Sequence, residues 1–191
     1  LMNCDGKDCG ADEQAPVALN AADKWIVSRL QKVEAEAAAH FRAYRFDLLA
    51  STLYHFAWNE YCDWYLELCK PALSNGDTPA QRGTRRTLVR VLETLLRLLD
   101  PLMPFVTEDI WQRVAPLSGN AGPTIMTQRW PAPEPKKNDD AAEADVAWLQ
   151  AFVLGVRQIR GELDISPAKT LSVLMQGATQ ADVDRMARLK H

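Results

Sequence analysis

One stretch of the sequence, residues 48–69, carries apolar side chains at almost every position around a helix and is bounded by Asp47 and Pro71. Its apolar members are Leu48, Leu49, Leu53, Phe56, Trp58, Tyr61, Trp64, Tyr65, Leu66 and Leu68. A helix without a polar face is normally buried among other helices. The stretch therefore predicts the central helix of a bundle, ended by a proline that cannot continue the backbone hydrogen bonds.

Capping signals place two further long helices on either side of this one. Residues 1–19 lack any apolar period and predict a loop, after which Asn20 and Asp23 form a capping pattern. Apolar residues at spacings of three and four then continue to about Tyr44. The run Thr78-Pro79-Ala80-Gln81 is typical of a helix start, and the helix that it opens is expected to reach Leu99.

The rest of the chain predicts shorter elements and one more long helix. A fourth helix is expected over 105–114, and a short extended segment over 124–128. Three prolines followed by Lys, Asn and Asp give residues 131–140 the composition of a linker. A fifth helix is expected over 141–163, because its apolar residues fall on one face.

The C-terminal residues indicate a change of structure. Residues 171–176 alternate well enough for a strand, and residues 180–190 have a helical pattern. A lone strand needs partners, so we expect the sequence to end inside a second small domain. The predicted fold is mostly α, with a connecting loop over 1–19, a helical bundle over 20–130, a linker over 131–140, and a last bundle helix with a truncated junction over 141–191.

Composition limits the classes of function. The formal net charge is -3, so any nucleic-acid site must be a local basic patch. No apolar run is long enough to cross a membrane, and the N-terminal residues lack the pattern of a signal peptide. We therefore expect a cytoplasmic protein without membrane contacts.

Residues able to support catalysis or metal binding are sparse. None of the three histidines stands in a nucleophile pattern with Ser or Cys, and there is no glycine-rich phosphate loop. Cys4 and Cys9 lack the two further ligands that zinc would need nearby, so no metal is expected. Cys62 and Cys69 lie in the apolar stretch and predict buried free thiols.

The third predicted helix carries the clearest asymmetry of charge. Arg82, Arg85, Arg86 and Arg90 fall within nine residues, and Glu93 is the first acid after them. Three of these arginines are spaced by four, so they stack along one helix face and could follow a phosphate backbone. The alternative is an ordinary solvated helix face.

Aromatic and polar side chains alternate in the second helix. The stretch contains Trp58, Asn59, Tyr61, Asp63, Trp64 and Tyr65. Unpaired RNA bases stack on such rings and bond to amides and carboxylates, which makes this stretch a candidate for base contacts. The alternative is core packing, and it must hold for some of the rings, because one helix cannot present all of them to a ligand.

The same residues closely resemble the valyl-tRNA synthetase family. The resemblance rests on the runs Tyr44-Arg45-Phe46-Asp47, Leu53-Tyr54-His55-Phe56-Ala57-Trp58-Asn59-Glu60-Tyr61-Cys62-Asp63-Trp64-Tyr65-Leu66-Glu67, Arg82-Gly83-Thr84-Arg85-Arg86-Thr87-Leu88, Pro101-Leu102-Met103-Pro104-Phe105 and Ile165-Ser166-Pro167-Ala168-Lys169. The stretch Trp58-Asn59-Glu60-Tyr61-Cys62-Asp63-Trp64-Tyr65 is highly specific. Isoleucyl and leucyl enzymes share the architecture with looser motifs.

The resemblance implies the anticodon-binding helical bundle of a class I aminoacyl-tRNA synthetase, with the start of a small α/β junction at its C-terminal end. Such an enzyme joins valine to its tRNA with ATP and magnesium and edits threonine. The two ATP-site signatures of the family, His-Ile-Gly-His and Lys-Met-Ser-Lys-Ser, do not occur in this sequence. The chain is therefore expected to be noncatalytic and without a cofactor of its own.

The resemblance also implies the partners. These are valine tRNAs and the catalytic and editing domains of the same protein, with a monomeric chain. We expect base contacts from Trp58, Asn59, Cys62, Asp63 and Leu66, and phosphate contacts from Arg82, Arg85, Arg86 and Arg90. The alternatives are the equivalent domain of an isoleucyl enzyme and a helical protein–protein adaptor.

Overall fold

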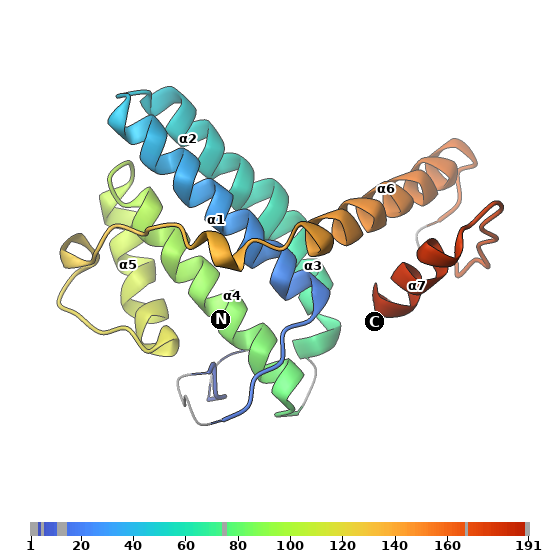
Figure 1. Ribbon diagram of the computed structural model, residues 1–191, viewed down its shortest axis with the longest axis horizontal. Helices are drawn as coiled ribbons and strands as arrows, with labels where there is room; N and C mark the ends of the chain where they lie inside the picture. The colour runs from blue at the N-terminus through green and yellow to red at the C-terminus, as the bar shows by residue number, and fades with distance from the viewer. Residues whose placement is uncertain (1–3, 5, 11–14, 74–75, 167, 190–191) are drawn as a thin grey trace.

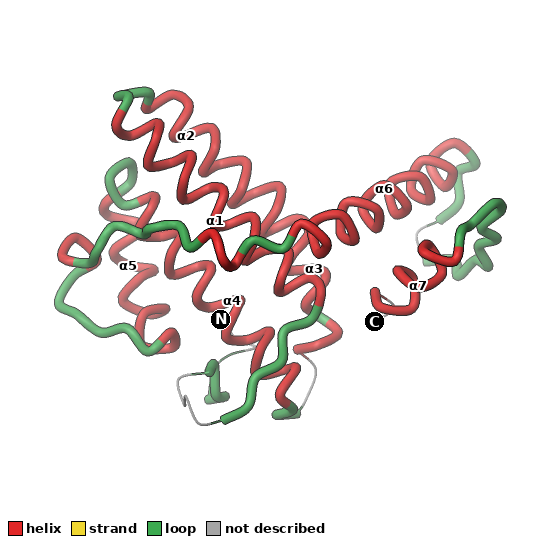
Figure 2. The backbone as a smooth tube through the Cα atoms, in the orientation of Figure 1, coloured by secondary structure: helices red, strands yellow, loops and turns green. Residues whose placement is uncertain are grey.

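The computed structural model describes residues 4, 6–10, 15–73, 76–166 and 168–189. Every regular element in these ranges is a helix (Figures 1 and 2). The predicted mostly α fold is thereby confirmed.

Helix α1 (Ala21–Arg42) is the element around which the bundle is built, because it contacts α2, α4 and α6. The predicted cap is present: the Asn20 side chain accepts from the Asp23 backbone, and the Asp23 carboxylate accepts from the Asn20 backbone. Two otherwise unpaired backbone amides of the first turn are thereby satisfied.

The predicted second helix is continuous but changes its winding. It comprises α2 (Phe46–His55), a π-helix η1 (Phe56–Tyr65) and α3 (Leu66–Cys69). It is not the central helix, which corrects the expectation from its composition. Its buried side chains lie along one side (Leu49, Leu53, Phe56, Tyr61, Tyr65 and Cys69), whereas Leu48, Tyr54 and Trp58 are exposed. Several apolar residues of this helix therefore face outward, and α1 occupies the centre.

A short 3-10 turn η2 (Pro71–Leu73) precedes α4 (Pro79–Leu99), which begins with the predicted Thr78–Gln81 capping box. The segment before α1 crosses α4 closely at Gly83, where an added Cβ would lie 2.1 Å from the Ala18 carbonyl oxygen. Helix α5 (Pro104–Val114) and the 3-10 turn η3 (Ala115–Ser118) pack against α4.

The segment between α5 and α6 is held in part by contacts with α1. The extended segment expected over 124–128 is instead a 3-10 turn η4 (Ile125–Thr127), because Thr124 caps it through the Met126 backbone. A further 3-10 turn η5 (Pro135–Lys137) follows in the expected linker. The Glu134 amide donates to Gln31 across 2.7 Å, which fastens this linker along α1.

Helix α6 (Asp140–Glu162) packs on α1 by its first half and then projects away from the bundle (Figure 1). Its predicted apolar face is buried at Val146 and Leu149 but exposed at Ile159. The strand predicted over 171–176 is wrong, because the described residues supply no neighbouring strand to pair with it. Helix α7 (Gln180–Leu189) follows, and Arg185 ties it to Asp145 of α6 at 3.1 Å.

Candidate nucleic-acid interface

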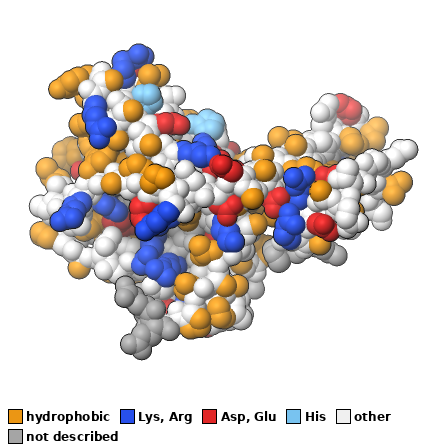
Figure 3. Space-filling model, viewed as in Figure 1, with side chains coloured by type: hydrophobic (Ala, Val, Ile, Leu, Met, Phe, Trp, Pro, Cys, Tyr) orange, Lys and Arg blue, Asp and Glu red, His pale blue; other side chains and the backbone are white. Residues whose placement is uncertain are grey.

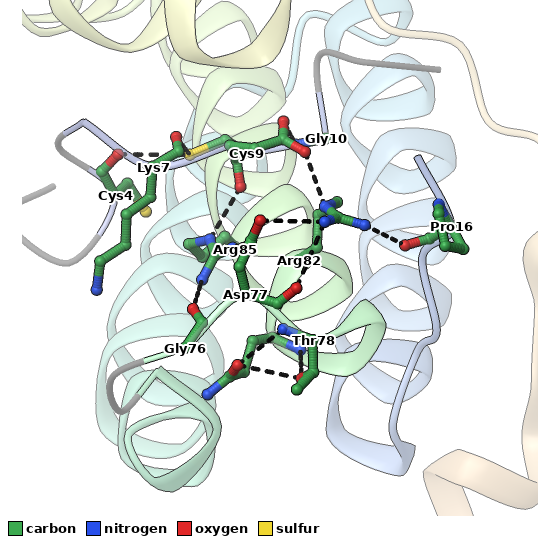
Figure 4. Close-up of polar contacts among 12 residues, drawn as sticks. Cys4, Lys7, Cys9, Gly10, Pro16, Gly76, Asp77, Thr78, Arg82 and Arg85 are labelled. Atoms are coloured by element: carbon green, nitrogen blue, oxygen red, sulfur yellow. Dashed lines mark hydrogen bonds and ion pairs between the residues drawn. The ribbon is translucent and has the colours of Figure 1, made fainter. Parts of the chain in front are cut away.

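Two of the four candidate arginines are engaged in internal contacts, which we call the arginine clamp (Figure 4). Arg85 is buried, and its guanidinium donates to the carbonyl oxygens of Asp8 and Gly76 and pairs with Asp77. Arg82 forms ion pairs with Asp8 at 2.8 Å and Asp77 at 3.1 Å. The expectation that all four arginines present themselves to phosphates is corrected, because Arg82 and Arg85 instead fasten the N-terminal segment to the start of α4.

The segment that the arginine clamp fastens also carries two buried cysteines. Cys4 and Cys9 belong to the core cluster, and the Cys9 thiol donates to the Cys4 carbonyl oxygen at 3.7 Å. All four cysteines of the chain are free thiols, and burial raises the pKa of Cys69 to about 12. Among the described residues, no group of three or more potential ligands is arranged to hold a metal ion.

The other two candidate arginines lie where a ligand could reach them. Arg86 is half-buried, its aliphatic stem lies against Gly10, and its guanidinium has no hydrogen-bond or ion-pair partner among the described residues. Arg90 is exposed one turn further along α4. Both line the same groove.

This groove, which we call the α1–α4 groove, has a volume of about 710 Å³. Its walls come from α1, α4 and the segment 130–137 that crosses in front of them. Four cations line it (Arg86, Arg90, Arg97 and Lys137), together with the three carboxylates of Glu34, Glu93 and Glu134. Figure 3 shows Lys and Arg side chains on this face of the molecule, with Asp and Glu side chains among them.

A buried carboxylate forms part of the wall of the α1–α4 groove. Glu34 of α1 is 5% exposed, and its Oε2 atom has no hydrogen-bond partner among the described residues. Burial raises the pKa of Glu34 to about 7, and Lys137 and Arg97 partly oppose that rise. By contrast, Glu93 on α4 is fully engaged, because it accepts from Arg97 and from the Trp111 indole.

The candidate base-contact residues lie on another face. Trp58, Asn59 and Asp63 are exposed on η1, and Cys62 and Leu66 are half-buried. The buried side of the same helix faces the bundle, where the Tyr61 hydroxyl donates to the Leu88 carbonyl oxygen of α4. The structure therefore does not bring these candidates together with the arginines of α4.

No helix of the described chain combines the length and the apolar character that crossing a membrane would need.

Comparison with known proteins identifies the family. Residues 23–175 match the family model described as the anticodon-binding domain of tRNA ligase. The chain belongs to this family.

Full-length relatives of this anticodon-binding domain are valine–tRNA ligases. It is 47% identical over 99% of its length to the enzyme of Laribacter hongkongensis (strain HLHK9). It is 49% identical over 99% of its length to that of Xanthomonas euvesicatoria pv. vesicatoria (strain 85-10). The chain spans only 20% and 19% of those two proteins. The resemblance to valyl-tRNA synthetases is confirmed, and the alternatives of an isoleucyl domain or an adaptor are not favoured.

Sequence reasoning missed one exposed feature of this anticodon-binding domain, an aromatic cluster where α1 turns into α2. Phe41 contacts the rings of Phe46 and Trp130, with ring centroids 5.7 and 5.5 Å apart. Tyr44 ends the turn with a φ of 56° and is 81% exposed. The closeness of Tyr44 and Phe46 is evident in the sequence, but the approach of Trp130 depends on the tertiary fold.

Proposed function

We propose that this domain holds the anticodon arm of valine tRNA within a valine–tRNA ligase, while a catalytic domain elsewhere in the same protein works on the other end of the tRNA. The match to valine–tRNA ligases along nearly the whole chain supports this proposal. ATP and magnesium would serve that catalytic domain. The residues of this chain do not fit them, because the sequence has no glycine-rich phosphate loop and the described residues offer no acidic cluster for a metal.

The proposal is supported in this chain by the α1–α4 groove, where Arg86 has no acidic partner among the described residues. Arg86 and Arg90 stand on its α4 wall, where each could contact one phosphate. The aromatic cluster lies next to it, since Trp130 lines the groove and contacts Phe41. Cations beside exposed rings are the usual elements of a single-strand RNA site. The outer side of η1 and the start of α3 form a second surface that could contact bases, with Trp58, Asn59 and Asp63 exposed and Cys62 and Leu66 half-buried.

The setting follows from the proposed role. A domain of a tRNA ligase would act in the cytoplasm, where translation takes place. Its partners would be valine tRNAs and the catalytic and editing domains of its own protein. The protein would be a monomer.

Salt-dependent binding of tRNA tests the phosphate contacts. The chain with both Arg86→Gln and Arg90→Gln should bind every tRNA more weakly, with a salt slope lower by about 0.7–0.9 for each phosphate that is no longer neutralised. Arg113→Gln is the matched control, because Arg113 is an exposed arginine on α5 that pairs only with Asp109 among the described residues. An unchanged affinity and slope in the double variant would reject the groove as the phosphate site.

A second titration tests the edge of η1. Asn59→Ala with Asp63→Ala should reduce the preference for valine tRNA over a tRNA with an exchanged anticodon, and it should leave the salt slope unchanged. If that preference survives in the double variant, the bases are contacted elsewhere.

A further inference from the structure

The α1–α4 groove contains a feature that phosphate binding does not require. Glu34 brings a carboxylate into the wall of this groove, is only 5% exposed, and leaves Oε2 without a donor among the described residues. A buried acceptor without a hydrogen bond destabilises the folded chain. A ligand that donates a hydrogen bond at this position would remove that destabilisation.

The surroundings of Glu34 define the chemistry of that ligand. The lining of the groove also includes the apolar side chains of Val27, Leu30, Val91, Trp130 and Pro131. A volume of about 710 Å³ lies within the range of small-ligand sites. A flat ring bearing N–H donors therefore fits the interior of the groove.

The cations at the edge of the groove indicate a second property of the ligand, a negative charge. Arg97 is held by Glu93 and by the Arg129 carbonyl oxygen, and Lys137 is paired with Glu134. Arg86 has no such acidic partner among the described residues and stands on the α4 wall. An anionic group on the ligand would thus be placed at Arg86, and Arg90 lies one turn further along the same wall.

We propose that the α1–α4 groove binds one unstacked nucleotide, with Glu34 accepting from the amino group of its base and Arg86 and Arg90 contacting its phosphate. This inference rests on the proposed function, since it treats the RNA as the partner. A base with an exocyclic amino group, such as cytosine, satisfies the carboxylate. Uracil presents carbonyl oxygens at the equivalent edge and would be disfavoured. A peptide segment would not require a phosphate-sized cationic rim beside the acceptor.

Binding of single-stranded oligocytidine and oligouridine of equal length to the full 191-residue chain tests the proposal, with valine tRNA as a third probe. The native chain should prefer oligocytidine about tenfold, since one good base contact discriminates by about 1–3 kcal/mol. Glu34→Gln preserves the shape but can also donate to uracil, so the preference should collapse. Glu36→Gln is the matched control, because it removes the same charge from an exposed position two residues along α1.

Each outcome decides the proposal. Equal preferences in Glu34→Gln and Glu36→Gln, or no preference in the native chain, would overturn the assignment of Glu34 while leaving tRNA binding intact. A chain that bound neither tRNA nor either oligonucleotide would overturn the proposed function as well. If Glu34→Gln loses helical circular dichroism, Thr94→Trp fills the groove from a half-buried position on α4 and should also abolish the preference.

Discussion

Tyr65 donates its phenolic hydrogen to Asp23 across 2.7 Å, with both side chains fully buried. The same carboxylate accepts from the Asn20 backbone at 3.1 Å and from the Thr84 hydroxyl at 3.0 Å. One buried group therefore joins the start of α1, the π-helix and α4. Burial raises the pKa of Asp23, and these hydrogen bonds oppose that rise.

Removal of one of these donors should weaken the bundle. Tyr65→Phe leaves Asp23 with one fewer partner in a buried site, so the free energy of unfolding should fall by about 1–3 kcal/mol. Thermal unfolding followed by circular dichroism measures the change. Tyr54→Phe, at a position that is 65% exposed on the same helix, should have almost no effect. Equal midpoints for the two variants would show that the Tyr65–Asp23 contact contributes little.

A cavity in the core should lower the free energy of unfolding by more than the loss of the Tyr65 hydroxyl does. Leu53 of α2 is fully buried, and Leu53→Ala should destabilise the chain by about 2–5 kcal/mol. Leu48→Ala removes the same atoms from a partly exposed position in that helix and should cost much less. Urea titration of both variants compares the two positions. A cost at Leu48 as large as that at Leu53 would contradict the placement of the core.

Glu34 should make stability depend on pH. Its pKa rises from 4.5 in the unfolded chain to about 7 in the folded one, so the folded state binds the proton more tightly. The free energy of unfolding should then fall as pH rises from about 4.5 to about 7, by up to about 3 kcal/mol. Lys137 and Arg97 face this carboxyl and reduce the effect, whereas Glu134 increases it.

The comparison that isolates Glu34 is Glu34→Gln against the native chain. The variant should be more stable near pH 8 and equally stable near pH 4, because only the ionised carboxylate is penalised. Chemical denaturation at both values measures this difference. A constant gap across pH would assign the pH dependence to other groups.

The arginine clamp distinguishes Arg85 from its neighbour in the sequence. Arg85→Met removes contacts with Asp8, Gly76 and Asp77 and should cost about 3 kcal/mol, because their polar partners lose a buried guanidinium. It should also speed hydrogen exchange at residues 8–10. Arg86→Met should change neither the free energy of unfolding nor the hydrogen exchange at residues 8–10. Equal protection of these amides in both variants would contradict the role of Arg85.

Local sequence signals predict those parts of the fold that local chemistry determines. The caps at Asn20 and Thr78 are predictable because each box satisfies its own backbone amides within four residues. The π-helix over 56–65 has no such local signal, and its buried rings are bonded to distant parts of the chain, Tyr61 to α4 and Tyr65 to α1.

The candidate arginines of α4 also depend on contacts that local sequence patterns do not predict. Spacing by four correctly aligns Arg82, Arg86 and Arg90 on α4, but no local pattern indicates which side chains meet an acid. Asp8 lies far away in the sequence and pairs with Arg82 at 2.8 Å. The burial of Glu34 is equally hidden, because it depends on tertiary packing that brings Glu34 into one groove with the distant residues 130–137.

Competition between two parts of valine tRNA shows which arm of the tRNA this domain holds. Labelled tRNA bound to the chain is challenged with its isolated anticodon stem–loop or with a minihelix of its acceptor stem. We predict that the anticodon stem–loop displaces the tRNA with nearly the affinity of the whole molecule and that the minihelix does so only at far higher concentration. Displacement by the minihelix alone would contradict the assignment of this domain to the anticodon arm.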